Sequence, residues 1–299
     1  MSANSTALCA AACVAAACAH PAFPHGPGAP SPAARRGPVR TGHLPIRGLQ
    51  MYFELHGEGG TPLVLLHGGG STIDSTYGCI LPRFARHRRV IALEEQAHGR
   101  TTDRDAPVRF ETSADDVDAL LAELGVDAAD VLGFSNGASV ALQVAIRHPA
   151  RVRRLVFASS MTRRDGAAPE FWDGFPGATL ADLPPPLRDA FLRVNPDPAQ
   201  LRRMFERDVE RMRSFRDVPD ADVARLDRPV LIVAGDRDVP TLEHLVALTR
   251  QLPRARLAIF PGGHGDYLGD PSAPPGSPAC ERAAEFTSWL VEQFLDGPA

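Results

Sequence analysis

The pentapeptide Gly-Phe-Ser-Asn-Gly at residues 133–137 constrains the fold more than any other segment of the chain. It follows an apolar run at residues 131–134 that reads as a buried strand, and it precedes an amphipathic pattern at residues 138–147 that predicts a helix. A sharp turn between them lifts the serine above the sheet edge, and the flanking glycines let neighbouring backbone pass without Cβ clashes. The segment predicts Ser135 as a nucleophile at a helix N-terminus, whose partial positive charge favours a developing anion. The plainer alternative is a turn that only joins a strand to a helix.

Strands and helices alternate along most of the chain. Five further apolar runs have the length of buried parallel strands, and three more amphipathic patterns have the period of helices. Thr112 and Asp115 are spaced as a capping box for the first of these three helices. The alternation predicts an α/β fold with a mostly parallel central sheet and helices on both faces. The strand runs are residues 62–66, 90–93, 155–158, 230–234 and 257–260, and the helical patterns are residues 112–124, 242–251 and 283–294.

Composition divides the chain into four parts. Residues 1–42 are rich in alanine and proline without hydrophobic periodicity, which predicts a disordered tail. The alternation of strands and helices breaks at residues 161–227, where three consecutive prolines and an Arg-rich amphipathic stretch predict a helical insertion. We therefore expect the first part of the core at residues 43–160 and its second part at residues 228–299.

The first part of the core opens near His43. Residues 43–56 read as two extended segments that turn at Arg47 and Gly48. This pattern predicts a β-hairpin at the edge of the sheet.

The tail bears on the location of the protein. Residues 7–19 are apolar and end in Ala-Cys-Ala, as in a short signal peptide, but no lysine or arginine precedes them. The sequence therefore favours a cytoplasmic location, with secretion as the alternative if this segment works as a signal. Cys79 and Cys280, the two cysteines of the body, show neither a disulfide framework nor zinc-like spacing, so we expect free thiols.

The charge of the chain disfavours several kinds of partner. Its 299 residues carry a formal net charge of -4, and the arginines are scattered instead of aligned along one face. We therefore expect neither nucleic acid nor an anionic membrane as a partner. No apolar run reaches the roughly 18 residues that a membrane-spanning helix requires. A small-molecule substrate is the expected partner, and the oligomeric state stays open.

A serine hydroxyl is a weak nucleophile, so Ser135 needs a base, and the base needs a group that holds it in place. His264 lies in a Gly-Gly-His-Gly-Asp segment after the last predicted strand, above the carboxyl edge of the sheet. Asp236 and Asp238 both follow the strand at residues 230–234, so either can reach the histidine. We expect Asp238 to be the acid because the more distal residue has room to turn towards the site, while Asp236 can bond to its own turn. A solvated loop histidine and a turn or capping aspartate are the alternatives.

A tetrahedral intermediate also needs hydrogen-bond donors where its oxyanion forms. His67 and three glycines at residues 68–70 follow the predicted strand at residues 62–66. We expect the oxyanion hole to consist of the backbone N–H groups of Gly69 and of Asn136, the residue after the nucleophile. A flexible loop or a phosphate cradle is the alternative, although the absence of a following Gly-Lys-Ser/Thr disfavours a P-loop. This site requires no metal and no cofactor.

The order of these segments resembles the α/β-hydrolase fold superfamily, and in particular its bacterial serine hydrolases of the esterase and peptidase type with a small helical cap. The resemblance covers nearly everything from about His43 onward. It implies the α/β-hydrolase fold, a Ser135, His264 and Asp238 triad, and a cap at residues 161–227 that covers the pocket and selects the substrate. It rests on the glycine loop at residues 67–69, the segment 91–100, the Ser135 pentapeptide, Gly-Asp-Arg-Asp at residues 235–238, and His264.

Three positions depart from the pattern of many members of that superfamily. Glu94 stands where many members have aspartate, and Ala97 stands where many have glycine. Both are structural positions, so neither departure puts the activity in doubt. Asn136 stands where many members carry methionine or a second glycine; its backbone N–H is unaffected, and its side chain is expected to shape the pocket floor.

The leading hypothesis is hydrolysis of an ester or similar acyl bond of a small molecule through an acyl-enzyme. His264 would first take the proton of Ser135 and then activate water. The alternatives are non-acyl chemistry on the same fold, such as carbon–carbon bond hydrolysis, a lyase or a cofactor-free oxygenase, and a non-catalytic ligand-binding protein. Phe171, Trp172 and Phe175 either line an apolar pocket or pack the insertion itself.

Overall fold

A computed structural model describes residues 40–269 and 277–298 of the chain. Its described part is built on an eight-stranded sheet with the strand order β1-β2-β4-β3-β5-β6-β7-β8. Strands β3 to β8 run parallel, while β1 and β4 both pair antiparallel with β2. The predicted mostly parallel sheet is confirmed. The strands are β1 (Arg40–Ile46), β2 (Leu49–His56), β3 (Leu63–Leu66), β4 (Val90–Leu93), β5 (Ala129–Phe134), β6 (Val152–Ala158), β7 (Val230–Gly235) and β8 (Ala255–Phe260).

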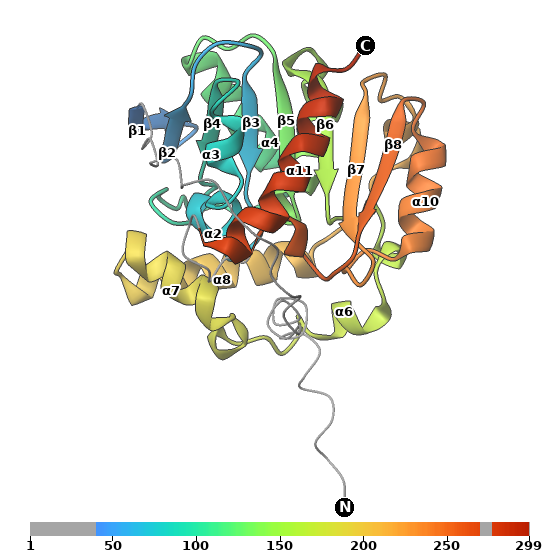
Figure 1. Cartoon of the computed structure of the whole chain (residues 1–299). Helices are drawn as coiled ribbons and strands as arrows, with labels where there is room; N and C mark the ends of the chain where they lie inside the picture. The colour runs from blue at the N-terminus through green and yellow to red at the C-terminus, as the bar shows by residue number, and fades with distance from the viewer. Residues whose placement is uncertain (1–39, 270–276, 299) are drawn as a thin grey trace, which may run out of the picture.

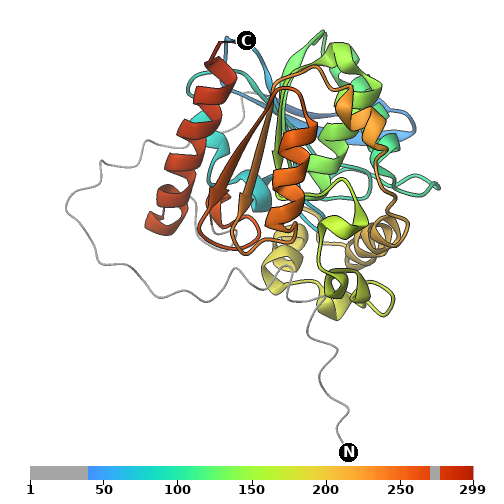
Figure 2. The same cartoon turned by 90° about the vertical axis from the view of Figure 1, so that its right-hand side faces the viewer.

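Helices cover both faces of this sheet (Figure 1, Figure 2). On one face lie α2 (Ile73–Tyr77), α3 (Leu81–Phe84) and α11 (Pro278–Asp296); on the other lie α4 (Phe110–Glu123), α5 (Asn136–Arg147) and α10 (Leu242–Gln251). Side chains alternate between the faces along a strand. Val64 therefore packs in the cluster that contains α4, α5 and α10, and Leu65 packs in the cluster that contains α2, α3 and α11. The predicted helices on both faces are confirmed.

The edge hairpin was predicted correctly. β1 and β2 turn at Arg47 and Gly48, both with positive φ, and β1 begins at Arg40, ahead of the expected start near His43.

One predicted helix start was wrong. Thr112 is not part of a capping box, because α4 begins at Phe110, before that residue. The Asp115 carboxylate instead accepts hydrogen bonds from Arg147 at the end of α5. The Asp115 side chain thus pairs with a residue on a neighbouring helix, which local spacing in the sequence does not reveal.

The segment between β6 and β7 is helical, and α8 is its longest helix. Figure 1 shows α7 and α8 below the sheet, at the end where the parallel strands finish. Two small apolar clusters hold the segment together, one around Trp172 and Phe215 and the other around Leu187, Phe191 and Met204. Its helices are α6 (Pro169–Asp173), α7 (Pro185–Val194), α8 (Pro198–Arg213) and α9 (Asp220–Ala224), with the 3-10 turns η2 (Arg164–Gly166) and η3 (Leu180–Asp182). Elsewhere in the described part of the chain lie the 3-10 turns η1 (Pro149–Arg151) and η4 (Asp266–Leu268).

The prediction of free thiols at Cys79 and Cys280 is wrong. The two residues form a disulfide across a sequence separation of 201. Cys79 lies between α2 and α3, and Cys280 lies in the first turn of α11, which packs against α3. The pairing follows from this helix contact, so cysteine spacing along the chain carried no signal for it.

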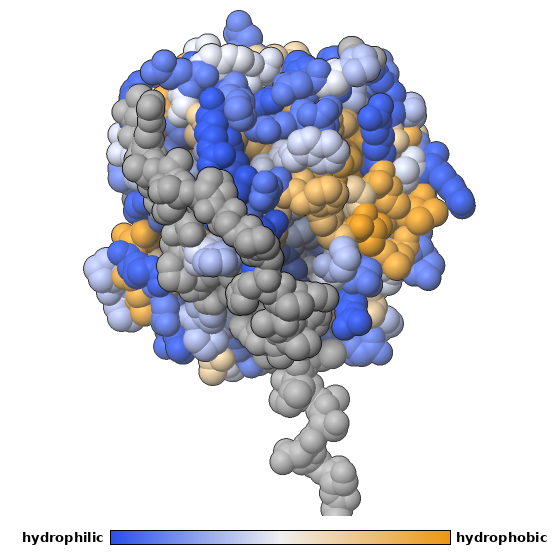
Figure 3. Space-filling model, in the orientation of Figure 1, coloured by the Kyte–Doolittle hydropathy of each residue, from blue (hydrophilic) through white to orange (hydrophobic). Residues whose placement is uncertain are grey.

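The surface of the described part has one notable apolar region. Ile259 on β8 and Phe286 and Trp289 on α11 are large exposed apolar residues, and Figure 3 shows apolar surface gathered over β8 and the adjoining part of α11. Within residues 40–269 and 277–298, none of the helices combines the length and apolar character needed to cross a membrane. The expected signal-like segment at residues 7–19 lies outside the described residues.

Candidate active site

Ser135 sits on a strained turn between β5 and α5. Its φ of 55° and ψ of -121° are unusual for a residue with a side chain. A Cβ atom at Gly133 would lie 2.1 Å from the carbonyl oxygen of Gly137, and one at Gly137 would lie 2.1 Å from that of Leu66. Glycine is therefore required at both flanking positions. Strain of this kind costs about 1–3 kcal/mol and is typical of functional sites, where the surrounding structure maintains it.

Loops at the carboxyl ends of three strands bring Ser135, His264 and Asp238 together. The Nε2 atom of His264 lies 3.1 Å from Oγ of Ser135, and its Nδ1 atom lies 2.7 Å from Oδ1 of Asp238. With the proton on Nδ1, the ring donates to the carboxylate and its Nε2 accepts from the serine hydroxyl. Asp236 does not take part in these hydrogen bonds, because its carboxylate accepts the N–H of Gly262 at 2.8 Å. We call Ser135, His264 and Asp238 the candidate triad.

The Asp238 carboxylate is buried and held by several donors. Its Oδ2 atom accepts from Oγ of Ser159 at 2.5 Å and from the N–H of Gly235 at 3.0 Å. Burial acts to raise the pKa of Asp238, but His264 and these donors outweigh it and hold that pKa below its ordinary value. The carboxylate is therefore ionised at neutral pH and can stabilise an imidazolium.

Sequence reasoning missed Ser159, which lies directly after β6. Ser159 has a φ of 53°, and its Oγ lies 2.6 Å from the hydroxyl oxygen of Tyr267. The signal that could have found it is its position, because it follows a parallel strand at the same sheet edge as the triad residues. Its backbone strain, like that of Ser135, accompanies a bond to the site.

Gly69 and Asn136, the expected oxyanion-hole residues, lie against each other beside Ser135. A Cβ atom at Gly69 would come within 2.4 Å of Nδ2 of Asn136, so the two residues are in close contact. Asn136 is the first residue of α5, where backbone N–H groups have no partner within the helix. Both residues border the same cavity as Ser135. The arrangement can place two N–H donors near a carbonyl oxygen attacked by Ser135.

A buried set of charges joins α8 to the glycine loop. Oδ2 of Asp208 accepts the N–H of Gly70 at 2.6 Å and lies 2.9 Å from Nε2 of His98. Arg211 donates to Oδ1 of Asp208 at 2.6 Å and to Oε2 of Glu95 at 2.7 Å. We call Asp208, Arg211, Glu95 and His98 the α8 ion cluster. Sequence reasoning missed it, since nothing in the pattern of α8 distinguishes Asp208 and Arg211 from surface charges.

The members of the α8 ion cluster shift one another's titration. Burial acts to raise the pKa of Asp208, but His98, Arg211 and the N–H of Gly70 hold it well below its ordinary value. Burial acts to lower the pKa of His98, but Asp208 outweighs it and raises that pKa. Burial acts to raise the pKa of Glu95, and Arg211 leads the groups that lower it below its ordinary value. Both carboxylates are therefore ionised at neutral pH.

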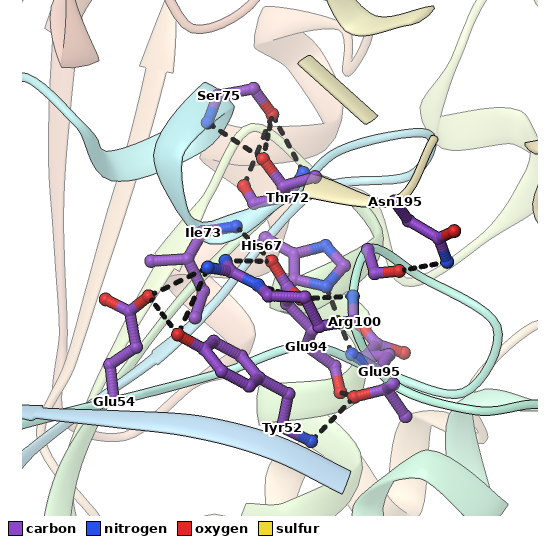
Figure 4. A network of polar contacts seen from close by, with 12 residues as sticks. Tyr52, Glu54, His67, Thr72, Ile73, Ser75, Glu94, Glu95, Arg100 and Asn195 are labelled. Carbon is purple, nitrogen blue, oxygen red and sulfur yellow. Dashed lines mark hydrogen bonds and ion pairs between the residues drawn. The ribbon is translucent and has the colours of Figure 1, made fainter. Parts of the chain in front are cut away.

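A second polar network supports the base of the glycine loop (Figure 4). Nε2 of His67 accepts the N–H of Glu95 at 3.1 Å, and burial lowers the pKa of this histidine. Glu94 binds Arg100 through a side-chain bond of 2.6 Å and through the backbone N–H of Arg100 at 2.7 Å. Ala97 adopts a φ of 66°, the left-handed conformation that favours glycine. Glu94 and Ala97, two of the positions that depart from the pattern of many superfamily members, thus lie in the loop after β4, which contacts His67 at the start of the glycine loop.

A cavity of about 220 Å³ opens in front of Ser135 and His264. Phe171 and Phe175 line it, whereas Trp172 is not part of the lining and packs against Phe215 with ring centroids 5.1 Å apart. Phe171 and Phe175 also pack against Trp172, so these two residues both line the cavity and pack the insertion, while Trp172 only packs it. Most of the wall is apolar. Its apolar side chains include Phe110, Phe134, Met161, Leu183, Leu187, Met204, Phe205, Val209, Met212, Phe215, Val239 and Leu268.

The described residues contain no group of three or more histidine, cysteine, aspartate or glutamate side chains arranged to hold a metal ion.

The sequence is similar to one protein-family model and to several curated proteins. Residues 61–195 match the family model described as alpha/beta hydrolase fold. The chain is 32% identical over 218 residues to the dihydrolipoyllysine-residue acetyltransferase component of the acetoin cleaving system of Pseudomonas putida, covering 72% of this chain and 57% of that protein. It is 32% identical over 156 residues to 2-hydroxymuconate semialdehyde hydrolase of Pseudomonas sp. strain CF600, covering 51% and 49%. The chain thus spans about half the length of these curated relatives.

Solved structures share the fold over most of the chain. The enol-lactonase from Burkholderia xenovorans LB400 superposes with a TM-score of 0.66 at 20% identity, covering 85% of this chain and all of that one. Est816, described as an N-acyl homoserine lactone degrading enzyme, superposes with a TM-score of 0.66 at 26% identity, covering 84% and 99%. These likenesses establish that the architecture described above is the α/β-hydrolase fold, which confirms the predicted fold class.

Proposed function

Because the chain belongs to the α/β-hydrolase fold superfamily, we propose that it is a serine hydrolase that cleaves an ester or related acyl bond of a small molecule. The observation that carries the proposal is the continuous hydrogen-bonded chain from Ser135 through His264 to Asp238. A serine paired with a base that is itself held by a buried carboxylate is the arrangement that makes the hydroxyl reactive.

The proposed reaction runs in two halves. Oγ of Ser135 attacks the carbonyl carbon while its proton moves to Nε2 of His264, and the N–H groups of Gly69 and Asn136 stabilise the oxyanion. When the intermediate collapses, the bond to the leaving group breaks and His264 gives its proton to that group. His264 then takes a proton from a water molecule, whose oxygen attacks the carbonyl carbon of the acyl-enzyme. When this second intermediate collapses, the bond between the carbonyl carbon and Oγ of Ser135 breaks, His264 returns its proton to Oγ, and the acid is released. Every step uses side chains and backbone groups of the chain itself, so we propose no cofactor.

We further propose that residues 161–227 form a cap over this site. Support comes from α8, whose Asp208 binds the N–H of Gly70 next to the oxyanion position, and from Phe171 and Phe175, which line the cavity. A cap of this kind excludes water and brings the apolar wall against the substrate.

Labelling with a fluorophosphonate probe, followed by mass mapping, tests the nucleophile. We expect a single adduct on Ser135 and turnover of p-nitrophenyl butyrate, with a loss of at least about 10⁴-fold in Ser135→Ala. Ser139→Ala is the matched control, because Ser139 borders the same cavity but pairs with Ser160 at 2.9 Å, and it should keep both labelling and turnover. Folded protein without an adduct on Ser135 would contradict the proposal.

Carbon–carbon bond hydrolysis is the second candidate, because a relative that is 32% identical is named for a muconate semialdehyde. Assay of 2-hydroxymuconate semialdehyde beside p-nitrophenyl butyrate separates the two. Cleavage of the semialdehyde with little ester turnover would favour this candidate. Ligand binding without turnover of either compound would favour a non-catalytic member of the superfamily.

The location of the activity is also open to test. The sequence favours the cytoplasm, while the Cys79–Cys280 disulfide supports secretion because disulfides persist in oxidising compartments. Alkylating free thiols in fractionated native cells, followed by mass spectrometry, decides between them. A linked pair in an exported fraction supports secretion, and two alkylated thiols in the cytosolic fraction support the cytoplasm.

A further inference from the structure

We propose that the cavity selects uncharged acyl compounds and rejects substrates whose acyl chain carries a carboxylate. The inference rests on the proposed function, because it names the substrate class of the same site. It follows from an imbalance of charge around the cavity.

The described cavity wall lacks a permanent cation. The chain contains no lysine, so any permanent positive charge has to come from arginine, and none of the lining residues is an arginine. Among the lining residues of the described wall, His264 has a basic side chain, and this side chain is already hydrogen-bonded to Asp238. A substrate carboxylate would therefore meet no guanidinium or ammonium group in this wall.

Negative groups, in contrast, border the same space. Asp182, Asp208 and Asp266 are all lining residues. Asp208 is the most enclosed of the three, and its partners keep it ionised. Arg211 and His98 partly balance the charge of Asp208, so the repulsion of a substrate carboxylate comes from the three aspartates together, in surroundings that screen charge less than water does.

Arg211, the arginine that binds Asp208, is not free to reorient towards a ligand in the cavity. Arg211 is only 1% exposed and is held between Asp208 and Glu95 at 2.6 and 2.7 Å. Its charge is thus matched by two carboxylates, and reorienting it towards a ligand would leave both of them buried without that partner. The remainder of the wall is mainly aromatic and aliphatic, which suits a neutral chain and does not solvate an anion.

Three matched esters test the selection: 4-nitrophenyl heptanoate, mono-4-nitrophenyl adipate, and its neutral methyl ester, 4-nitrophenyl methyl adipate. At pH 7.5 we expect kcat/KM for the monoanion to be at least about 100-fold below that for the methyl diester. The two neutral esters should differ by less than about 10-fold. Cleavage of the monoanion within about 10-fold of the methyl diester would overturn the inference.

Variants at Phe171 separate charge from size. Phe171 is a half-buried lining residue on α6, a different helix from the one that carries Asp208. Phe171→Arg should narrow the gap between the monoanion and the methyl diester by at least about 10-fold, whereas Phe171→Gln should leave the gap in place. An equal gap in the two variants would show that charge does not control the selection.

A binding measurement tests the charge selection of the cavity even if the proposed hydrolase activity is absent. If none of the esters is turned over in a Ser135-dependent way, the proposed function fails, but the cavity can still be probed. Heptan-2-one and 6-oxoheptanoate have the same chain and differ in the terminal methyl or carboxylate. Calorimetry should show at least about 10-fold weaker binding of the anion, and equal affinities would overturn the inference.

Discussion

The candidate triad reaches the cavity through Ser135 and His264, and the α8 ion cluster reaches it through Asp208, but the two sets are held in place by different means. Each triad residue stands on a loop at the end of a parallel strand, so the sheet itself sets the distances among Ser135, His264 and Asp238. The α8 ion cluster instead joins a helix of the insertion to two loops of the core through buried charges. The catalytic geometry thus depends on backbone topology, while the position of α8 depends on side-chain pairing.

This difference predicts which changes damage which part of the molecule. Changes in the α8 ion cluster should lower stability and displace the wall of the cavity. Changes around the triad should alter catalysis with little effect on folding.

The largest effect on stability is expected from Arg211→Met. The substitution leaves the carboxylates of Asp208 and Glu95 buried without their shared partner, and breaking such a pair costs about 3–5 kcal/mol. The free energy of unfolding in urea measures the loss. Arg202→Met is the matched control, because Arg202 is exposed on the same helix, and it should change stability by less than about 0.5 kcal/mol. Similar stability of the two variants would show that charge pairing does not hold α8.

An intermediate effect, mainly on catalysis, is expected from Ser159→Ala, which also removes the partner of the Tyr267 hydroxyl. Alanine removes the donor to Oδ2 of Asp238 and keeps a side chain at the same positive φ. A carboxylate with one donor fewer binds the imidazolium of His264 more strongly, so the acid limb of the kcat/KM profile should move to higher pH. We expect kcat/KM at neutral pH to fall about 10-fold.

Ser160→Ala provides the comparison for Ser159→Ala. Ser160 is the next residue in the chain and borders the same cavity, but its hydroxyl pairs with Ser139 and does not contact Asp238. The pH profile of Ser160→Ala should keep the acid limb of the parent protein. A shift of the same size in both variants would mean that Ser159 does not act through Asp238.

The same contrast explains what the sequence could predict. Ser135, Asp238 and His264 each follow a strand, and parallel strands end at one edge of a sheet, so local patterns and their order were enough to expect them together. The fold was predictable for the same reason, because hydrophobic periodicity marks each strand and helix. The helix start at Phe110 was not predicted, because its N-cap residue, Arg109, makes no side-chain capping bond and so leaves no local signal.

Contacts between distant side chains could not be predicted. Asp208 lies 138 residues from Gly70, whose N–H it accepts, and Cys79 lies 201 residues from Cys280. An aspartate on an Arg-rich helix looks the same in the sequence whether it faces solvent or a buried loop. Only the packing of the insertion on the core decides which, and a single sequence does not display that packing.

The smallest effect should appear in the pH dependence of the α8 ion cluster. His98 faces Asp208, Arg211, Glu95 and His67. Its pKa is raised in the folded state, so its contribution to stability is fully present below the unfolded value of about 6.5 and is lost as the pH rises through the folded pKa. Asp208 has a lowered pKa, so its contribution is present above about 3.9 and is lost only in strong acid.

His98→Gln isolates this contribution, because glutamine can still donate a hydrogen bond to Asp208 but carries no charge at any pH. The unfolding free energy of the parent protein should exceed that of the variant most at about pH 5.5, and the difference should shrink steadily towards pH 9. Because His67 and Asp208 titrate in both proteins, their contributions largely cancel in the difference. A difference independent of pH would show that His98 stabilises α8 through its shape and hydrogen bonds, and that the position of α8 does not depend on the charge of this residue.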